Sequence, residues 1–359
     1  AAGWAAGLGV AVGVLVALTG SAHVAGQGAA PREWRDYAGG PDSSRFVDAT
    51  QITRDNVGTL QVAWTYPDGD TDFNPLMVHG VVYSRARGNR IVALDAATGK
   101  ELWVSEPVQA FLIRGMNYWE SADGRDRRLF FSTLDRLRAF DARTGKPIPT
   151  FGRNGEVDLR EGLDRDPADV VQQSRLPGRI FENLIIMGSA TNREYTSAPG
   201  DIRAYDVRSG ALVWSFRTIP RAGELGADTW PVNARATVGG ANNWAGMSLD
   251  EKRGIVYVPT GSASPDFYGG TRKGTNLFAN SILALEAATG KYKWHYQVVH
   301  HDLWDRDLPA NPNLVTVVHK GKRIDAVAQI TKHGYIFLFD RQNGKPLFPI
   351  KEVPVPASD

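Results

Sequence analysis

Apolar and polar positions alternate with a period of two along several segments of the chain, and this pattern predicts β-strands. The segment 60–66 alternates in this way, and the runs 254–259 and 281–286 are apolar stretches of strand length. The last run leads into a turn signal at Thr289-Gly290. Side chains with this period line opposite faces of a strand. The fold is therefore expected to be all-β.

One hairpin pattern recurs five times. It consists of an apolar strand, an acidic residue, a turn that contains glycine, and usually a second strand that ends in an aromatic residue. The acidic positions are Asp95, Asp141, Asp206, Glu286 and Asp340, which lie 46 to 80 residues apart. The carboxylate can accept backbone N–H bonds in the turn, and the glycine supplies a positive φ. Repeats of this kind predict a β-propeller built from small antiparallel sheets.

Three of the repeats carry a tryptophan at the aromatic position, namely Trp103, Trp214 and Trp294. A large ring at the end of an outer strand can pack over the neighbouring sheet. We therefore interpret these tryptophans as structural and nominate none of them for function.

Composition narrows the class of protein further. The 359 residues are 42% hydrophobic and 22% charged with 38 glycines, as expected of a soluble, turn-rich globular protein. The net charge is +2, and no run of lysine or arginine forms a basic stripe, so nucleic acid is not an expected partner. The absence of cysteine excludes disulfides, iron–sulfur clusters, thiol catalysis and a covalently attached haem in this chain.

The N-terminal segment differs from the rest. Residues 1–30 contain no charged side chain, and the apolar run 8–18 is followed by small residues. This pattern is typical of a secretory signal peptide, and a membrane anchor is the alternative. We expect residues 31–359 to form the propeller part of an exported, periplasmic protein, which the anchor alternative would attach to the membrane.

The densest chemistry lies in residues 294–307, which contain three aspartates, three histidines and three aromatic residues. His300 and His301 point to opposite faces of an extended chain, so they are poor joint ligands for one metal. Asp302 stands between His301 and two bulky side chains, and burial there would suit a general base. Asp305 and Asp307 are either part of this site or solvated turn residues.

Two segments of the chain resemble the pyrroloquinoline quinone (PQQ) dependent dehydrogenases, and especially the membrane-type glucose dehydrogenases. They are His-His-Asp-Leu-Trp-Asp-Arg-Asp-Leu-Pro-Ala at 300–310 and Lys-His-Gly-Tyr-Ile-Phe-Leu-Phe-Asp-Arg-Gln-Asn-Gly at 332–344. The similarity runs from about Trp34 to the C-terminus. It implies a propeller that has eight blades in the family, with tryptophan-docking repeats like those described above.

The resemblance implies roles for single residues. Asp302 would be the base that removes the hydroxyl proton of a sugar or alcohol while hydride passes to the quinone. Lys332 would lie against the quinone oxygens and stabilise negative charge there. Trp244 would be the floor on which the flat cofactor stacks, with Asn243 beside it.

Further cofactor contacts are implied at Arg114, which would meet the carboxylates of PQQ, and at Thr191 and Ser174. PQQ in this family also needs Ca²⁺ or Mg²⁺, which prefer oxygen ligands. Three residues are candidates for that cation site: Asn192, Glu194 and Asp302.

The chain departs from the family pattern at several points. The alcohol-oxidising members carry adjacent cysteines and an additional asparagine where Ser262 stands here, so the resemblance favours the sugar-oxidising branch. The glucose enzymes usually have a histidine near the position of Trp119, which leaves the substrate open. Because the chain has no haem-binding segment, electrons would pass to ubiquinone or to a cytochrome.

The chain ends soon after the fifth repeat. We therefore expect it to be part of a longer protein and to be inactive alone, because an open arc would expose sheet edges. A non-catalytic exported propeller that binds protein partners remains the alternative function. Asp302, Lys332 and Trp244 favour the enzyme, because a scaffold has no reason to carry them together.

Overall fold

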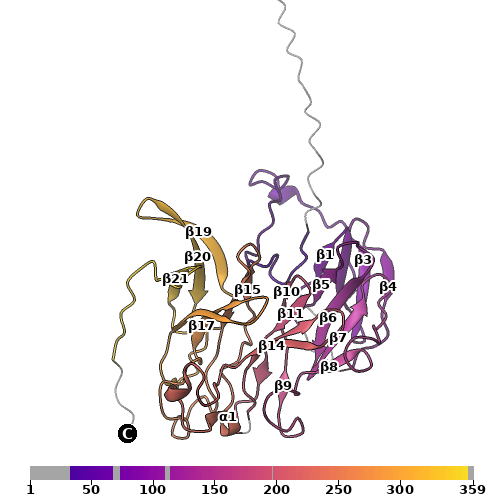
Figure 1. Cartoon of the computed structure of the whole chain (residues 1–359). Helices are drawn as coiled ribbons and strands as arrows, with labels where there is room; N and C mark the ends of the chain where they lie inside the picture. Colours follow the sequence, from indigo (N-terminus) through magenta and orange to yellow (C-terminus); the bar gives the residue numbers. More distant parts are fainter. Residues whose placement is uncertain (1–32, 68–72, 110–113, 196, 355–359) are drawn as a thin grey trace, which may run out of the picture.

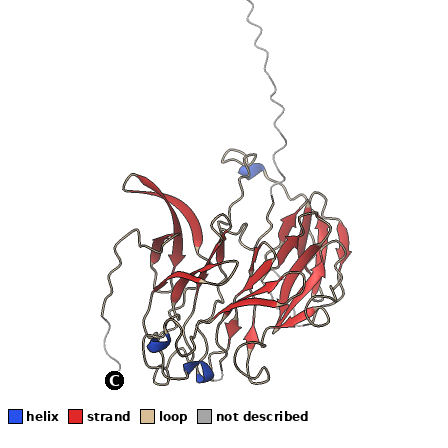
Figure 2. Ribbon diagram, viewed as in Figure 1, coloured by secondary structure: helices blue, strands red, loops and turns tan. Residues whose placement is uncertain are grey.

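The computed structural model describes residues 33–67, 73–109, 114–195 and 197–354, so the expected leader at 1–30 lies outside the described residues. Strands dominate these ranges (Figure 2). The helical turns described are η1 (Val57–Thr59), η2 (Ala227–Thr229) and α1 (Ala234–Thr237). Within the same ranges, no helix combines the length and the apolar character that crossing a membrane requires.

Five antiparallel sheets follow one another along the described chain (Figure 1). The first contains β1 (Leu76–Val78), β2 (Val81–Ala86), β3 (Arg90–Asp95) and β4 (Glu101–Val104). The second contains β5 (Asn117–Glu120), β6 (Arg127–Thr133), β7 (Arg136–Asp141) and β8 (Glu156–Asp158). The third contains β10 (Arg179–Phe181), β11 (Leu184–Met187), β13 (Ile202–Asp206) and β14 (Leu212–Phe216). The fourth contains β15 (Ser248–Asp250), β16 (Ile255–Pro259), β17 (Ser281–Glu286) and β18 (Tyr292–Gln297). The fifth contains β19 (Asn313–His319), β20 (Lys322–Ile330) and β21 (Ile336–Asp340), and a separate pair is formed by β9 (Gln172–Gln173) and β12 (Ala190–Thr191).

The first strands of successive sheets lie side by side. β5 contacts β10, β10 contacts β15, and β15 contacts β19. Ser43, in the segment that precedes β1, joins three of these strands, because its hydroxyl bonds to Arg179 and Ser248 and its carbonyl accepts a bond from Asn313. Sheets whose inner strands surround one axis form a β-propeller, so the predicted all-β propeller fold is confirmed.

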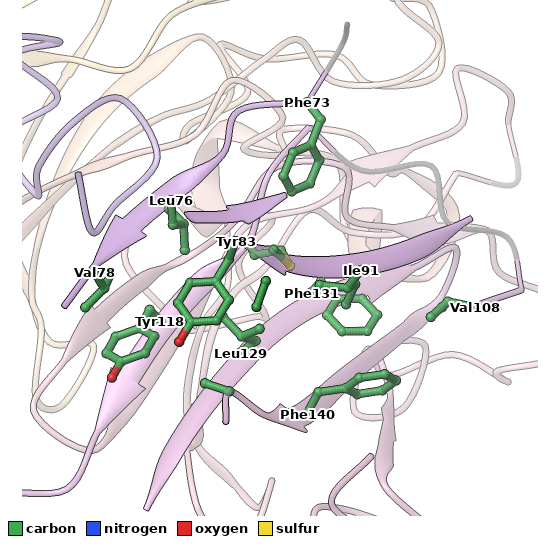
Figure 3. Close-up of a cluster of buried hydrophobic side chains, with 13 residues drawn as sticks. Phe73, Leu76, Val78, Tyr83, Ile91, Val108, Tyr118, Leu129, Phe131 and Phe140 are labelled. Carbon is green, nitrogen blue, oxygen red and sulfur yellow. The ribbon is translucent and has the colours of Figure 1, made fainter. Parts of the chain in front are cut away.

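The sheets pack face to face because their strands bury both faces. In β6, Leu129 and Phe131 point into the cluster shared with the first sheet, shown in Figure 3, whereas Phe130 points into the cluster shared with the third sheet. The same alternation in β17 sends Leu283 toward the third sheet and Ile282 toward the fifth. Each interface is therefore filled by side chains of period two from both of its sheets.

The docking tryptophans connect successive sheets, as predicted. The indole N–H of Trp103 donates to the carbonyl of Ala142 in the second sheet's turn, Trp214 to Ala287, and Trp294 to Arg341, each over 3.1 Å. A Cβ added to Gly290 would lie 2.5 Å from the Trp214 ring, so only glycine fits beneath it. The acidic residue of the repeat also acts as expected: in Asp95, for example, the carboxylate accepts the N–H of Thr98 over 2.9 Å.

One predicted strand is wrong. Residues 60–66 are not a strand, because they pair with no neighbouring strand among the described residues. Docking accounts for the two aromatic positions: Trp64 donates to the carbonyl of Ala96 over 3.1 Å, and Tyr66 donates to Glu101 over 2.7 Å. Leu60 and Val62, the other apolar positions of the alternation, are exposed.

Candidate active site

Loops at the ends of strands surround a pocket of about 470 Å³. The short strands β9 and β12 supply one wall, through Gln173 and Thr191. The other walls come from the segment 242–244 before β15, the loop 262–266 after β16, Asp307 before β19, and Lys332 after β20. The third, fourth and fifth sheets thus place side chains distant in sequence around one cavity.

All of the residues nominated as cofactor contacts line this pocket. They are Arg114, Ser174, Thr191, Asn243, Trp244 and Lys332. The nominated cation ligands behave differently: Asn192 lines the pocket, whereas Glu194 and Asp302 do not. The structure therefore brings together the residues of one predicted group and separates those of the other.

Trp244 is held in place by the hydrogen bonds of its neighbour Asn243 and by its own indole N–H. The neighbouring Asn243 is buried, and its amide N–H₂ donates to the carbonyls of Gly246 (2.8 Å) and Pro259 (2.7 Å). The indole N–H of Trp244 donates to the carboxylate of Asp307 over 2.8 Å. The ring is half-buried and forms part of the pocket wall, so it offers a fixed aromatic face.

Lys332 lies between two carboxylates. Its Nζ donates to Asp305 over 2.8 Å and to Asp307 over 3.2 Å, and it stands 5.7 Å from the centre of the Trp244 ring. Burial alone would lower the pKa of Lys332, but the hydrogen bonds and charges of the two aspartates outweigh it and raise the pKa. The ammonium is therefore a permanent positive charge at the pocket wall.

Asp307 is a site residue that the sequence left open between a site role and a turn. It is buried, and its carboxylate accepts from Trp244, from Lys332 and from the backbone N–H of Ser262 at 2.6 Å. Burial would raise the pKa of Asp307, but the charge of Lys332 and these hydrogen bonds lower it, so the carboxylate stays ionised. The signal in the sequence that could have identified Asp307 as a site residue was its Asp-x-Asp spacing from Asp305.

Asp302 is buried, and its carboxylate accepts hydrogen bonds from four donors. One of its oxygens accepts the backbone N–H of Arg306 (2.6 Å) and the amide of Asn280 (3.0 Å), and the other accepts the N–H of Trp304 (2.9 Å). The Ser262 hydroxyl donates to it as well. Three of these donors share one oxygen, Oδ2, and Oδ1 accepts only the N–H of Trp304. The arrangement shapes the loop 302–307, and Asp302 does not reach the pocket wall.

Asp266 is the second carboxylate that lines the pocket, and sequence reasoning missed it. It is buried, and burial raises its pKa to about 6 although Arg193 opposes the shift. The exposed Arg193 side chain lies 3.2 Å from Asp266 and 3.8 Å from Asp305. Arg193 therefore bridges two loops at the edge of the pocket. A Ser-Pro-Asp turn carries little signal in the sequence, because such turns are common on protein surfaces.

The predicted cation ligands do not converge. Glu194 is exposed, and the Asn192 side chain accepts the backbone N–H of Glu194 over 3.2 Å. Within the described ranges, no three His, Asp or Glu side chains are grouped so that they could hold a metal ion. Oxygen atoms are nevertheless present at the pocket: the Ser264 hydroxyl donates to the carbonyl of Asn192 over 3.3 Å, and Asp266 lies two residues further on.

The pocket fits an anionic planar group. Four cations line it, namely Arg114, Arg175, Arg193 and Lys332, against the two carboxylates of Asp266 and Asp307. Ser189 also lines it, and its hydroxyl is buried with no hydrogen-bond partner among the described residues. PQQ carries three carboxylates on a flat ring system, so excess positive charge, an aromatic wall and an unused donor all suit it.

The structure shows where two of the residues that depart from the family pattern lie. Trp119 belongs to the core between the second and third sheets, where it donates to the carbonyl of Glu182 over 2.9 Å, and it does not line the pocket. Ser262 does line the pocket, and it connects Asp302 to Asp307 through its hydroxyl and its backbone N–H.

Comparison with known proteins agrees with this geometry. Residues 34–359 match the family model for the β-propeller domain of the PQQ-dependent glucose, ethanol and alcohol dehydrogenases. The quinoprotein glucose dehydrogenase A of Acinetobacter calcoaceticus is 35% identical across 92% of this chain and 46% of its own length. The quinate/shikimate dehydrogenase (quinone) of Acinetobacter baylyi is also 35% identical, across 91% of this chain and 45% of its own length.

The crystal structure of the quinohemoprotein alcohol dehydrogenase of Comamonas testosteroni superposes with a TM-score of 0.76 and 28% identity, over 91% of this chain and 50% of that one. The chain thus spans about half the length of the curated relatives it matches. Because the family model covers nearly all of the residues, the chain belongs to the PQQ-dependent glucose, ethanol and alcohol dehydrogenase family of β-propellers.

Proposed function

We propose that the protein is a PQQ-dependent dehydrogenase that oxidises a hydroxyl group of a sugar or alcohol, with glucose-type sugars as the first candidates. The observation that carries this proposal is the single pocket in which Trp244, Lys332 and Asp307 meet, among four cations. The family membership and the names of the relatives support the same reaction class. Electrons would pass to ubiquinone or to a cytochrome. The protein would lie in the periplasm, either attached to the membrane or free.

The side chains have separate tasks in this proposal. PQQ, when bound, supplies the electrophilic carbonyl carbon that accepts the hydride of the substrate. Trp244 supports the ring system, and the arginines Arg114 and Arg175 pair with carboxylates. Lys332 keeps its positive charge beside the quinone oxygens, where negative charge develops during hydride transfer.

We assign the general base to Asp305 in place of Asp302. A base needs a free acceptor position within reach of the hydroxyl proton. Asp302 already accepts from four donors, three of them on one oxygen, and none of these donors is Lys332 or Arg193 at the pocket. Among the described residues, Asp305 has one close hydrogen bond, from Lys332, and lies 3.8 Å from Arg193. Both of these partners line the pocket, so Asp305 stands at its edge, although it is not itself a lining residue, and has acceptor positions left for a proton. In this assignment Asp302 keeps the loop 302–307 in shape.

The cation would be Ca²⁺ or Mg²⁺, bound through oxygen atoms. Asn192 remains a proposed ligand because it lines the pocket, and Asp266 is proposed as the carboxylate in place of Glu194 and Asp302. Asp266 is buried beside the cavity, and in the part of the chain that the structure describes its close partner is the exposed Arg193, so a cation could replace that ion pair.

The test is dye-linked oxidation by the natural full-length protein, reconstituted with PQQ and Ca²⁺ or Mg²⁺, over glucose, other aldoses, polyols, short alcohols and quinate. We expect turnover that requires both the quinone and the cation. Asp305→Asn should lower kcat about 100-fold or more, since it removes the base, whereas Asp302→Asn should act mainly on stability. If the folded protein neither binds PQQ nor turns over any substrate, it is a non-catalytic scaffold.

A further inference from the structure

Arg272 is the most deeply buried cation near the pocket. It lies in the loop between β16 and β17 and has no exposed surface. Its guanidinium donates to the side-chain oxygen of Asn276 over 2.8 Å, to the carbonyl of Pro265 over 3.2 Å, and to the carbonyl of Asp302. These hydrogen-bond acceptors are all neutral groups, and Nε is buried without a partner. Burying a charge in this way is unfavourable, so a local function is the expected reason for it.

The carbonyls that Arg272 holds belong to the two loops that supply the carboxylates of the site. Pro265 immediately precedes Asp266, which lines the pocket. Asp302 is the first residue of the loop that carries Asp305 and Asp307. One nitrogen, Nη2, donates to both carbonyls and so ties the two loops together, while Nη1 anchors the planar group on Asn276. A lysine would have to reach all three acceptors from one ammonium, without this second anchor.

The connection continues through the side chain of Asp302. Its carboxylate accepts the backbone N–H groups of Trp304 and Arg306, which lie on either side of Asp305. If Arg272 moves, the loop loses its first anchor, and the position of Asp305 relative to Lys332 changes.

We propose that Arg272 is a positioning residue of the active site, which sets the placement of Asp305 and Asp266 from behind the pocket. This inference rests on the proposed function for its effect on turnover, but its effect on the loop does not depend on turnover. Displacements of about 1 Å can reduce catalysis by about two orders of magnitude. Arg114 comes from another segment, and Asp307 keeps its own bonds to Trp244 and to the backbone of Ser262. We therefore expect the aromatic wall to stay in place when Asp305 shifts.

The experiment compares Arg272→Met and Arg272→Lys with a matched control, Arg179→Met, in the full-length protein. Arg179 is equally buried and donates to the carbonyls of Met247 and Tyr37 and to the Ser43 hydroxyl, but it lies at the propeller axis and does not line the pocket. Both methionine variants should lower stability. Arg272→Met should lower kcat about 100-fold per PQQ-loaded site, with Arg272→Lys intermediate and PQQ affinity within about threefold of wild type. Arg179→Met should keep the wild-type kcat.

Hydrogen exchange of the 304 and 306 amides gives a second readout that needs no turnover. These amides should exchange faster in both Arg272 variants and at the wild-type rate in Arg179→Met. If wild-type protein shows no turnover while the exchange rates change as expected, the proposed function fails and the positioning role stands. Unchanged exchange in the Arg272 variants, or an equal loss of kcat in Arg179→Met, would overturn the positioning role. If Arg272→Met does not fold, Arg272→Lys alone decides by the same criteria.

Discussion

The indole N–H of Trp244 donates a 2.8 Å hydrogen bond to the carboxylate of Asp307. This bond connects the segment before β15, in the fourth sheet, to the segment before β19, in the fifth. This bond fixes the aromatic wall of the pocket relative to the segment with the proposed base. The same carboxylate also accepts from Lys332. Aromatic wall, fixed cation and acidic loop are therefore set as one unit, which precise orientation of a cofactor requires.

Asp307→Asn should loosen this unit. The neutral amide cannot balance the charge of Lys332. In addition, an NH₂ group replaces one of the two carboxylate oxygens, and this donor then faces the N–H of Trp244 or Ser262. We expect the free energy of unfolding to fall by about 2–4 kcal/mol, as for one partner removed from a buried ion pair, and the dissociation constant of PQQ to rise about tenfold or more. Urea unfolding and an absorbance titration measure the two effects. Asp325→Asn, which breaks the more exposed pair with Arg253, should cost less than about 1 kcal/mol and leave PQQ binding unchanged.

Gly290→Ala tests the tryptophan docking that holds the sheets together. Gly290 has a φ of +70°, and an added Cβ would lie 2.5 Å from the Trp214 ring, so strain and overlap add. We expect a loss of about 3 kcal/mol in the free energy of unfolding. Gly321 has a similar φ of +74° with nothing within 4 Å of an added Cβ. Gly321→Ala should therefore cost only about 1–2 kcal/mol, and equal losses in the two variants would contradict the docking account.

Asp164 should make the fold sensitive to acid. Burial would raise the pKa of Asp164, but hydrogen bonds from Arg221 and Arg235 outweigh it and lower the pKa to about 2, below its ordinary value of 3.8. A carboxyl with a lowered folded-state pKa stabilises the protein above about pH 4, and this contribution is lost as the pH falls through about 2. Asp164→Asn should therefore cost about 1–2 kcal/mol near pH 7, after allowance for solvent screening. Denaturant curves should show this difference from wild type shrinking between pH 4 and pH 2. A constant difference would show that the loss is not electrostatic.

The fold could be predicted because its signal is repeated. Five copies of the hairpin, each with an acidic residue and a turn glycine, report the same local structure independently. The strand predicted at 60–66 was wrong because an apolar–polar alternation does not show whether the backbone pairs with a neighbour, and here Leu60 and Val62 are exposed. Trp64 and Tyr66 are partly buried by docking on a sheet to which their own backbone does not pair.

The site was only partly predictable for a related reason. Arg114, Trp244 and Lys332 come from separate segments, and only the family resemblance placed them together before the structure did. Within the loop 302–307, sequence spacing could not tell that Asp302 accepts four hydrogen bonds from backbone and side-chain donors whereas Asp305 is bonded to Lys332. That distinction depends on loop hydrogen bonds and on Ser262 and Asn280, which are distant in the chain. Asp266 was missed because its burial depends on packing between two loops.

The most direct test of the account is an equilibrium titration of PQQ, in the presence of Ca²⁺, into the full-length wild type, Trp244→Ala and Trp304→Ala. Trp304 is 74% exposed and does not line the pocket, so it controls for the loss of a tryptophan. We expect saturable binding to wild type and to Trp304→Ala, with a dissociation constant at least about tenfold higher for Trp244→Ala, which loses the stacking surface. Equal affinity in all three proteins, or no binding to the wild type, would contradict the assignment of this pocket to the quinone.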